Sequence, residues 1–231
     1  MIRNVAIITS LFDYPSHYLP LFYKNALKYF DEKDIHIVRN NGLVTNGSYY
    51  DKLYFYKIPK VLEYIKEKIL GNYEYILFLD ATDTNFYSSP NNIIDLFLSK
   101  NCSIIFGAEK GLWPNTSYTH LYESKNINSE YKYLNSGTYF GFTEKIIKHM
   151  ETIIDKGYEN GIDDQGKWTI EYLLSNDIII DYNCEFFMSS FESKKYFEIE
   201  NNKVKLLLYN PIVIHDNGPH NDNTIKVTNL L

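Results

Sequence analysis

One short stretch constrains this chain more than any other: an unbroken apolar run, Tyr75 to Leu79, which ends directly in Asp80 and is followed by Asp83. A continuous apolar run of this length is typical of a strand that is buried on both faces of a parallel sheet. In open α/β sheets, ligands bind beyond the carboxyl ends of the strands. Two carboxylates at such an end suit a metal ion. The alternative, equally open at this point, is that Asp83 only begins a turn over residues 83 to 85.

Composition restricts the classes of partner. The 231 residues are 45% hydrophobic, so the chain can bury a full core, and we expect one domain over residues 1–231. The net charge is -6, and the arginines are Arg3 and Arg39. Because phosphate contacts by Lys and Arg dominate nucleic-acid binding, we expect no nucleic-acid partner. A phosphate-bearing ligand would then need a metal ion to offset its charge.

Nothing in the sequence suggests a membrane anchor. The segment Val5 to Phe12 is apolar, but it is short and interrupted by Thr9 and Ser10, so it reads as a first strand and not as a leader. No run approaches the roughly 18 to 20 apolar residues of a membrane helix. The cysteines Cys102 and Cys184 form no disulfide framework, which favours a reducing compartment. We expect a cytoplasmic or virus-factory location.

The apolar periodicity predicts alternating strands and helices in the first half and a more mixed second half. Strands are expected at 4–9, 35–39, 75–79, 103–107, 138–142, 178–180, 204–209 and 212–214. Helices are expected at 20–30, 60–70, 91–100, 144–156 and 164–174. The pattern predicts a three-layer α/β domain with a mixed, mostly parallel central sheet.

Five segments occur in a recognisable order: FLDATD (78–83), GAEKGLWP (107–114), YLNSGTYFGF (133–142), GIDDQ (161–165) and IHDNGP (214–219). Together they resemble the glycosyltransferase domain of the multifunctional procollagen lysyl hydroxylases and its relatives among the procollagen galactosyltransferases. The resemblance spans about residues 4 to 219. It implies a GT-A-like fold with a UDP-sugar donor and a divalent cation, usually Mn2+, with Mg2+ as the other choice.

By position, the resemblance implies that Asp80, Asp83 and His215 are the metal ligands. The chemistry agrees, since hard carboxylates suit Mg2+ or Mn2+ and an imidazole shifts the preference away from Ca2+. Without the other motifs, His215 would be read as a histidine that happens to precede a turn.

The resemblance also implies the residues at the reacting sugar and the acceptor. Trp113 corresponds to a position near the acceptor, although an isolated Trp is usually in the core. Asp163 and Asp164 correspond to an acidic stretch at the sugar, although such a pair could merely begin a helix.

The donor site is implied at several further positions. Asn135, Ser136 and Gly137 are expected to form a turn that faces the donor sugar, and a turn is also their plain reading. The other expected donor-binding residues are Thr9, Lys60, Thr82, Gln165, Asn217 and Gly218.

Three departures from the family pattern affect the donor more than the metal. Ala81 and Thr82 replace a tyrosine between the two carboxylates. A tryptophan is absent near Asn46, where Tyr49 or Tyr50 could substitute, and His220-Asn221 stands where a lysine is common.

The expected activity is transfer of glucose from UDP-glucose to galactosyl-hydroxylysine of a collagen-like protein, with retention. The alternatives are transfer of galactose from UDP-galactose to hydroxylysine, a non-catalytic nucleotide-sugar-binding domain, and a haloacid-dehalogenase-type phosphatase. The phosphatase reading is weakened by Thr82, which stands where its general acid is expected.

Overall fold

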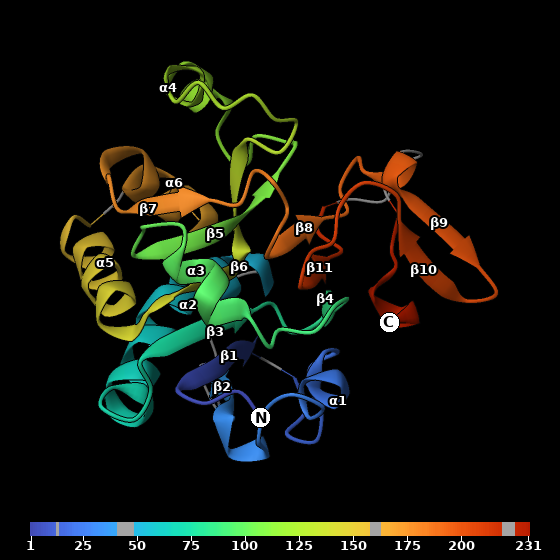
Figure 1. The fold of residues 1–231 in the computed structure, drawn as a ribbon. Helices are drawn as coiled ribbons and strands as arrows, with labels where there is room; N and C mark the ends of the chain where they lie inside the picture. The colour runs from blue at the N-terminus through green and yellow to red at the C-terminus, as the bar shows by residue number, and fades with distance from the viewer. Residues whose placement is uncertain (13, 41–48, 158–162, 219–224) are drawn as a thin grey trace.

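A six-stranded sheet organises the fold in the computed structural model, which describes residues 1–12, 14–40, 49–157, 163–218 and 225–231 (Figure 1). The strand order is β2-β1-β3-β6-β5-β7. Strand β6 runs antiparallel to β3 and β5, and the other neighbours pair in parallel, so the predicted mixed, mostly parallel sheet is confirmed. The strands are β1 (Val5–Phe12), β2 (Ile35–Asn40), β3 (Tyr75–Leu79), β5 (Ile104–Glu109), β6 (Tyr133–Phe142) and β7 (Ile178–Ile180).

Strand β3 shows why the sheet is buried on both faces. Ile76 and Phe78 belong to one apolar cluster, and Leu77 and Leu79 belong to the other. All four side chains are fully buried. Alternation along the strand therefore supplies both faces of the sheet from one apolar run, as the sequence predicted.

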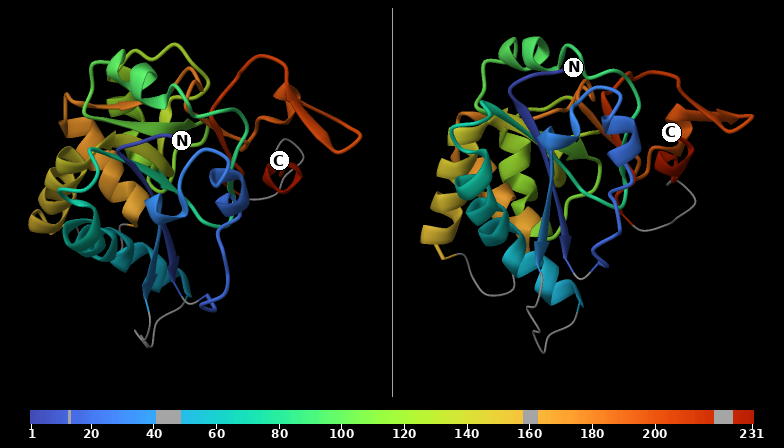
Figure 2. Two further views of the ribbon diagram at one scale, coloured as in Figure 1. Left: turned by 60° about the horizontal axis from the view of Figure 1, so that its bottom comes forward. Right: turned by 90° about the horizontal axis from the view of Figure 1, so that it is seen from below.

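Helices cover these two faces and complete the three predicted layers. One cluster packs under α2 (Tyr49–Tyr64), α5 (Thr143–Asp155) and α6 (Asp164–Leu174), and the other packs against α1 (Tyr23–Ala26) and α3 (Ile93–Leu98). Figure 2 shows α2, α5 and α6 together on one side and the hairpin of residues 197–206 on the other. The remaining described helices are η1 (Glu32–Asp34), η2 (Ile65–Ile69, a π-helix), η3 (Thr116–Tyr118), α4 (Thr119–Ser124), η4 (Lys194–Tyr196) and η5 (Thr228–Leu230).

A second sheet, absent from the prediction, joins distant parts of the chain. Its order is β4-β11-β8, from β4 (Thr84–Phe86), β11 (Val213–His215) and β8 (Phe187–Ser189). A separate hairpin pairs β9 (Phe197–Glu200) with β10 (Lys203–Leu206), where one strand over 204–209 was expected.

Four other expectations need correction. Residues 135–137, expected as a turn, lie inside β6, and Thr84 and Asn85, the alternative turn, lie in β4. Pairing steps from Phe106↔Tyr139 to Gly107↔Asn135, so β6 bulges away from β5 there. The helix expected at 60–70 begins at Tyr49, and the one expected at 20–30 is limited to α1. Tyr49 and Tyr50 lie in α2, but their side chains, like residues 46, 220 and 221, are outside the described part.

Candidate active site

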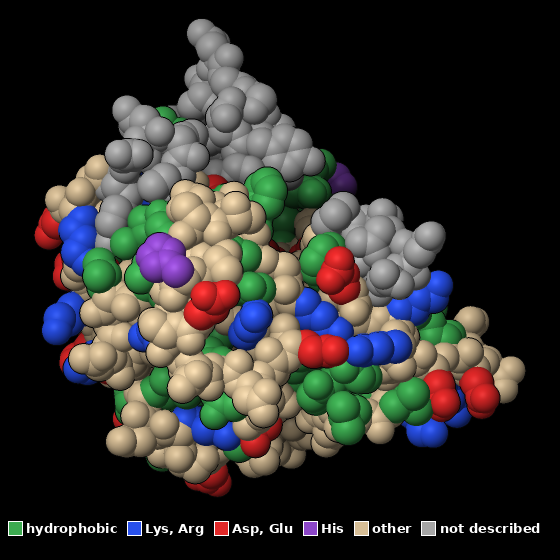
Figure 3. All heavy atoms as spheres, turned by 90° about the horizontal axis from the view of Figure 1, so that it is seen from above, with side chains coloured by type: hydrophobic (Ala, Val, Ile, Leu, Met, Phe, Trp, Pro, Cys, Tyr) green, Lys and Arg blue, Asp and Glu red, His purple; other side chains and the backbone are tan. Residues whose placement is uncertain are grey.

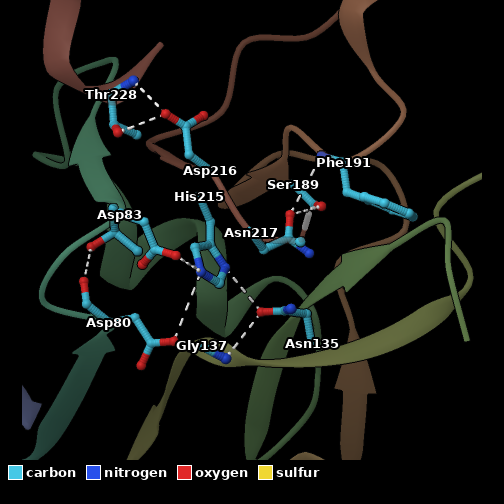
Figure 4. A network of polar contacts seen from close by, with 12 residues as sticks. Asp80, Asp83, Asn135, Gly137, Ser189, Phe191, His215, Asp216, Asn217 and Thr228 are labelled. Carbon is cyan, nitrogen blue, oxygen red and sulfur yellow. Dashed lines mark hydrogen bonds and ion pairs between the residues drawn. The ribbon is translucent and has the colours of Figure 1, made fainter. Parts of the chain in front are cut away.

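Three side chains converge at the end of β3, as the sequence predicted. Asp80 follows β3 and Asp83 precedes β4, while His215 ends β11, whose register sets His215 opposite Thr84. His215 Nε2 lies 3.4 Å from Asp83 Oδ2 and 3.8 Å from Asp80 Oδ2 (Figure 4). Pairing of β4 with β11 therefore closes the site from the far end of the sequence.

These three side chains could hold a metal ion. They each offer a ligand atom, and these atoms lie within 4.8 Å of one another. Asn135 Oδ1 accepts a hydrogen bond from the Gly137 N–H at 3.0 Å and lies 3.0 Å from His215 Nδ1. An oxygen in that position assigns the proton to Nδ1 and leaves Nε2 free to bind a cation.

Gly137 makes room for this group. A Cβ atom there would lie 2.6 Å from Asp80 Oδ2 and would overlap with His215 Cε1. The backbone of β6 thus passes directly beneath the candidate ligands, which no other residue type would permit. The position and the oxygen and nitrogen donors fit a divalent cation such as Mn2+ or Mg2+.

Asp216 anchors the backbone next to His215. Its Oδ2 accepts hydrogen bonds from the backbone N–H groups of Val227 and Thr228 and from the Thr228 hydroxyl, each at 2.7 Å. Its own N–H donates to the Asp83 carbonyl at 2.7 Å. The chain on either side of His215 is thereby tied to both the β4 strand and the C-terminal segment.

A half-buried lysine that the sequence reasoning missed links Asp80 to Asp164. Lys57 Nζ, on α2, lies 2.9 Å from Asp80 Oδ1 and 3.0 Å from Asp164 Oδ2. Burial alone would lower the pKa of Lys57, but the two carboxylates outweigh it and raise the pKa. Lys60, the predicted phosphate contact, instead pairs with Glu63 at 2.7 Å. Lys57 is therefore the cation beside the candidate metal ligands.

Replacing Lys57 by Met should destabilise the ion-free protein, because Asp80 and Asp164 would lose their shared cation. Because the Lys57 and Asp164 side chains are 13% and 5% exposed and that of Asp80 is 32% exposed, this loss should cost about 2 kcal/mol. Urea denaturation in EDTA measures the effect, and Lys60→Met, which removes an exposed pair, should cost about 0.5 kcal/mol or less. Equal losses in the two variants would contradict this reading of Lys57.

Asp163 and Asp164 lie at the start of α6 and contact other residues of the site. Asp163 Oδ1 accepts from the Gly166 N–H at 2.7 Å, which is the helix-capping role considered above. Its Oδ2 also accepts from Trp113 Nε1 at 3.0 Å. Asp164 accepts from the Ser136 hydroxyl at 3.0 Å. Trp113 is 62% exposed, so the core alternative for this residue is wrong.

The carboxylate of Glu109, which the sequence reasoning also missed, lies among three side-chain amides. Glu109, the last residue of β5, accepts hydrogen bonds from Gln165 Nε2 and Asn217 Nδ2 at 2.7 Å and from Asn135 Nδ2 at 3.3 Å. It is 6% exposed. One buried carboxylate therefore orients three side chains that were predicted to bind the donor.

Burial raises the pKa of the Glu109 carboxyl from its ordinary 4.5 to about 7, although hydrogen bonds from Gln165 and Asn135 lower it. In that interval the folded chain keeps a proton that the unfolded chain has released. The free energy of unfolding should therefore fall as the pH rises from 4.5 to about 7, by up to ~1.4 kcal/mol per pH unit.

Urea denaturation in EDTA across this pH interval tests the effect by comparison with Glu109→Gln, which cannot titrate there. The difference in unfolding free energy should move against the wild type as the pH rises. A difference that does not depend on pH would show that Glu109 keeps its ordinary pKa in the folded protein.

Most of the predicted site residues line one cavity of about 600 Å³. The exceptions are Thr9, which is buried in β1, Thr82, which is exposed, and Lys60. The cavity is lined by Lys57, Asp80, Asp83, Glu109, Gly111, Leu112, Trp113, Asn135, Ser136, Gly137, Asp163, Asp164, Gln165, Phe191, His215, Asn217 and Gly218.

Charged side chains of both signs lie on the surface. On the face shown in Figure 3, the described Lys and Arg side chains are interspersed with acidic ones and do not gather into one basic area. Within the described ranges, no helix has the length and apolar character needed to span a bilayer.

Comparison with a solved structure identifies the class of this fold. The chain is similar to a glycosyltransferase involved in glycosylation of the major capsid of PBCV-1, with a TM-score of 0.56, 12% identity and 94% of each chain covered. At that identity the likeness shows the fold alone. The fold is that of a glycosyltransferase, and it carries an Asp-Asp-His group that could bind a metal.

The family follows from the sequence match. Residues 55–231 match the family described as the PLOD GT domain, and the chain belongs to this family. The resemblance inferred from the five sequence segments is thereby confirmed.

Curated relatives include the uncharacterized protein R699 of Acanthamoeba polyphaga mimivirus, 29% identical over 162 residues that cover 68% of this chain and 33% of that protein. Mouse procollagen-lysine,2-oxoglutarate 5-dioxygenase 2 is 28% identical over 155 residues, 62% of this chain and 20% of that protein. The rat multifunctional procollagen lysine hydroxylase and glycosyltransferase LH3 is 25% identical over 158 residues, with the same coverage. The chain thus matches a third or less of the length of these relatives.

Proposed function

We propose that this glycosyltransferase moves glucose from UDP-glucose to galactosyl-hydroxylysine in a collagen-like polypeptide, with Mn2+ as its cation and with retention at the anomeric carbon. The observation that carries the proposal is the Asp80, Asp83 and His215 group, which faces the same cavity as Trp113 and Asp163. The names of the mouse and rat relatives support the acceptor. Transfer of galactose from UDP-galactose to hydroxylysine is the second candidate.

The donor diphosphate belongs at the acidic end of the cavity. When bound there, Mn2+ supplies positive charge that stabilises the departing diphosphate, an effect worth several kcal/mol. Lys57 lies beside Asp80, so it adds a second positive charge, and Asn217 and Gly218 line the adjacent wall. Burial would lower the pKa of His215, but its carboxylate neighbours raise it, so a proton would compete with the cation for this imidazole.

The sugar and the acceptor hydroxyl then lie toward Trp113. The bond from the anomeric carbon to the diphosphate oxygen breaks and its electron pair leaves with UDP. For retention, the acceptor oxygen forms the new bond on the same face of the sugar that UDP leaves. Asp163 takes the acceptor proton, and burial, which raises its pKa, makes it a better base. Such base catalysis contributes on the order of 10²–10⁴ in rate. Asp164, held by Lys57 and Ser136, faces the positive charge that develops on the sugar.

A panel of UDP-sugars with Mn2+ tests the proposal, first by UDP release and then with a galactosyl-hydroxylysine peptide. We expect UDP-glucose to give the fastest release and to label the peptide. Binding of UDP-sugars without release of UDP would instead support a non-catalytic binding domain. The phosphatase alternative is overturned by membership of a glycosyltransferase family.

A further inference from the structure

Phe191 occupies an unusual position in the cavity. It lies just after β8 and lines the same cavity as the Asp-Asp-His group and Trp113. Figure 4 places it on the far side of Asn217 from Asp80 and Asp83. The ring is therefore at the end of the cavity away from the candidate metal ligands.

Gly111 and Gly218 lie against opposite edges of the Phe191 ring. A Cβ atom at Gly111 would lie 2.9 Å from Phe191 Cε1, and one at Gly218 would lie 2.6 Å from Phe191 Cδ2. Neither glycine position could carry a side chain without moving the ring. The half-buried ring is thus fixed by its edges, and the surface left to it lines the cavity.

The backbone around Phe191 is anchored as well. Its N–H donates to Asn217 Oδ1 at 3.4 Å, and its carbonyl accepts from the Ser193 hydroxyl at 2.9 Å. Lys110 Nζ donates to the carbonyl of Glu192 at 3.0 Å, which ties this turn to the segment after β5. The ring is therefore preorganised, which lowers the entropic cost of packing a ligand against it.

We propose that Phe191 is a specificity-determining residue that forms an apolar wall of the acceptor subsite and packs against a pyranose ring. The inference rests on the proposed function, which puts the diphosphate at the acidic end and leaves the Phe191 and Trp113 end for the acceptor. An aromatic ring offers a broad apolar surface to the carbon-bound hydrogens of a sugar, and Trp113 lines the same cavity. A flexible aliphatic acceptor gains less from such a wall.

The test measures Michaelis constants with UDP-glucose, Mn2+ and methyl β-D-galactopyranoside as the acceptor probe. Phe191→Ala should raise the KM for the galactoside about tenfold to hundredfold and change the KM for UDP-glucose much less. Tyr182→Ala, which removes an exposed aromatic side chain outside the cavity lining, is the matched control and should change neither constant.

Gly111→Ala gives an independent route, because it keeps the aromatic ring but pushes it from its place. It should raise the galactoside KM in the wild-type background and add nothing in the Phe191→Ala background. Gly111→Ala in the wild-type background also covers the case in which Phe191→Ala fails to fold, as does Phe191→Leu, which should give an intermediate KM.

The outcomes separate this inference from the function on which it rests. No UDP release from any UDP-sugar by the wild type would reject the proposed function itself. Release of UDP without transfer to the galactoside would overturn the pyranose subsite. Transfer with a galactoside KM that is the same in wild type and Phe191 variants would overturn the role of Phe191 alone.

Discussion

Replacing Asp80 by Asn should reduce sugar transfer about a thousandfold and leave the fold intact. The exchange removes a negative charge from the candidate metal group, and loss of about 4 kcal/mol of Lewis-acid stabilisation corresponds to that factor. The similar shape of Asn preserves the packing near Gly137, where a carboxylate oxygen lies close to the backbone. Initial rates of UDP release with saturating UDP-glucose and Mn2+ measure the effect.

The control for this variant is Asp95→Asn, which changes the same charge at an exposed position of α3. It should retain the wild-type rate. A variant of Asp80 that keeps full activity would mean that the reaction does not pass through this carboxylate.

Gly137→Ala should weaken Mn2+ binding by about tenfold to hundredfold, the range seen when groups that orient metal ligands are lost. The new methyl group would press on both Asp80 Oδ2 and His215 Cε1, so at least one of them must move. Calorimetric titration of Mn2+ gives the affinity.

A double variant separates steric pressure from simple damage to β6. If the alanine acts through His215, then Gly137→Ala should destabilise the wild type more than it destabilises His215→Ala, where the clash is relieved. Equal destabilisation in both backgrounds would place the strain elsewhere in the strand.

The metal group was predictable because its residues carry their chemistry in local patterns. Asp80 ends an apolar run, which alone suggested a ligand site, but His215 was read as a metal ligand only through the resemblance that the five segments carry. Their convergence depends on pairing of β4 with β11, and neither β4 nor β8 was predicted. Three-residue strands are too short for alternation to distinguish them from turns.

Other parts of the site depended on tertiary context. Asn135, Ser136 and Gly137 have the composition of a turn, but pairing with β3 holds them in β6 while the strand bulges away from β5. Glu109 had a usable signal, since it follows an apolar strand as Asp80 does. It was missed because the predicted strand ended at residue 107, which left Glu109 in the loop, whereas β5 extends to Glu109.

Nothing in the sequence marked Lys57, because the predicted helix began after it, at residue 60. Apolar spacing predicted a helix that begins at residue 60, whereas α2 begins at Tyr49 and continues through Pro59. The earlier turns, which bring Lys57 under Asp80 and Asp164, were therefore missed. The expectation of one domain over residues 1–231 stays a prediction.

The most direct test of the account is a titration of Mn2+ into the metal-free wild type and into His215→Ala, followed by electron paramagnetic resonance of the free ion. The account predicts one site in each wild-type chain and an affinity at least about a hundredfold lower in the variant, because an imidazole ligand is lost. Equal affinities would contradict the claim that His215 binds the same cation as Asp80 and Asp83.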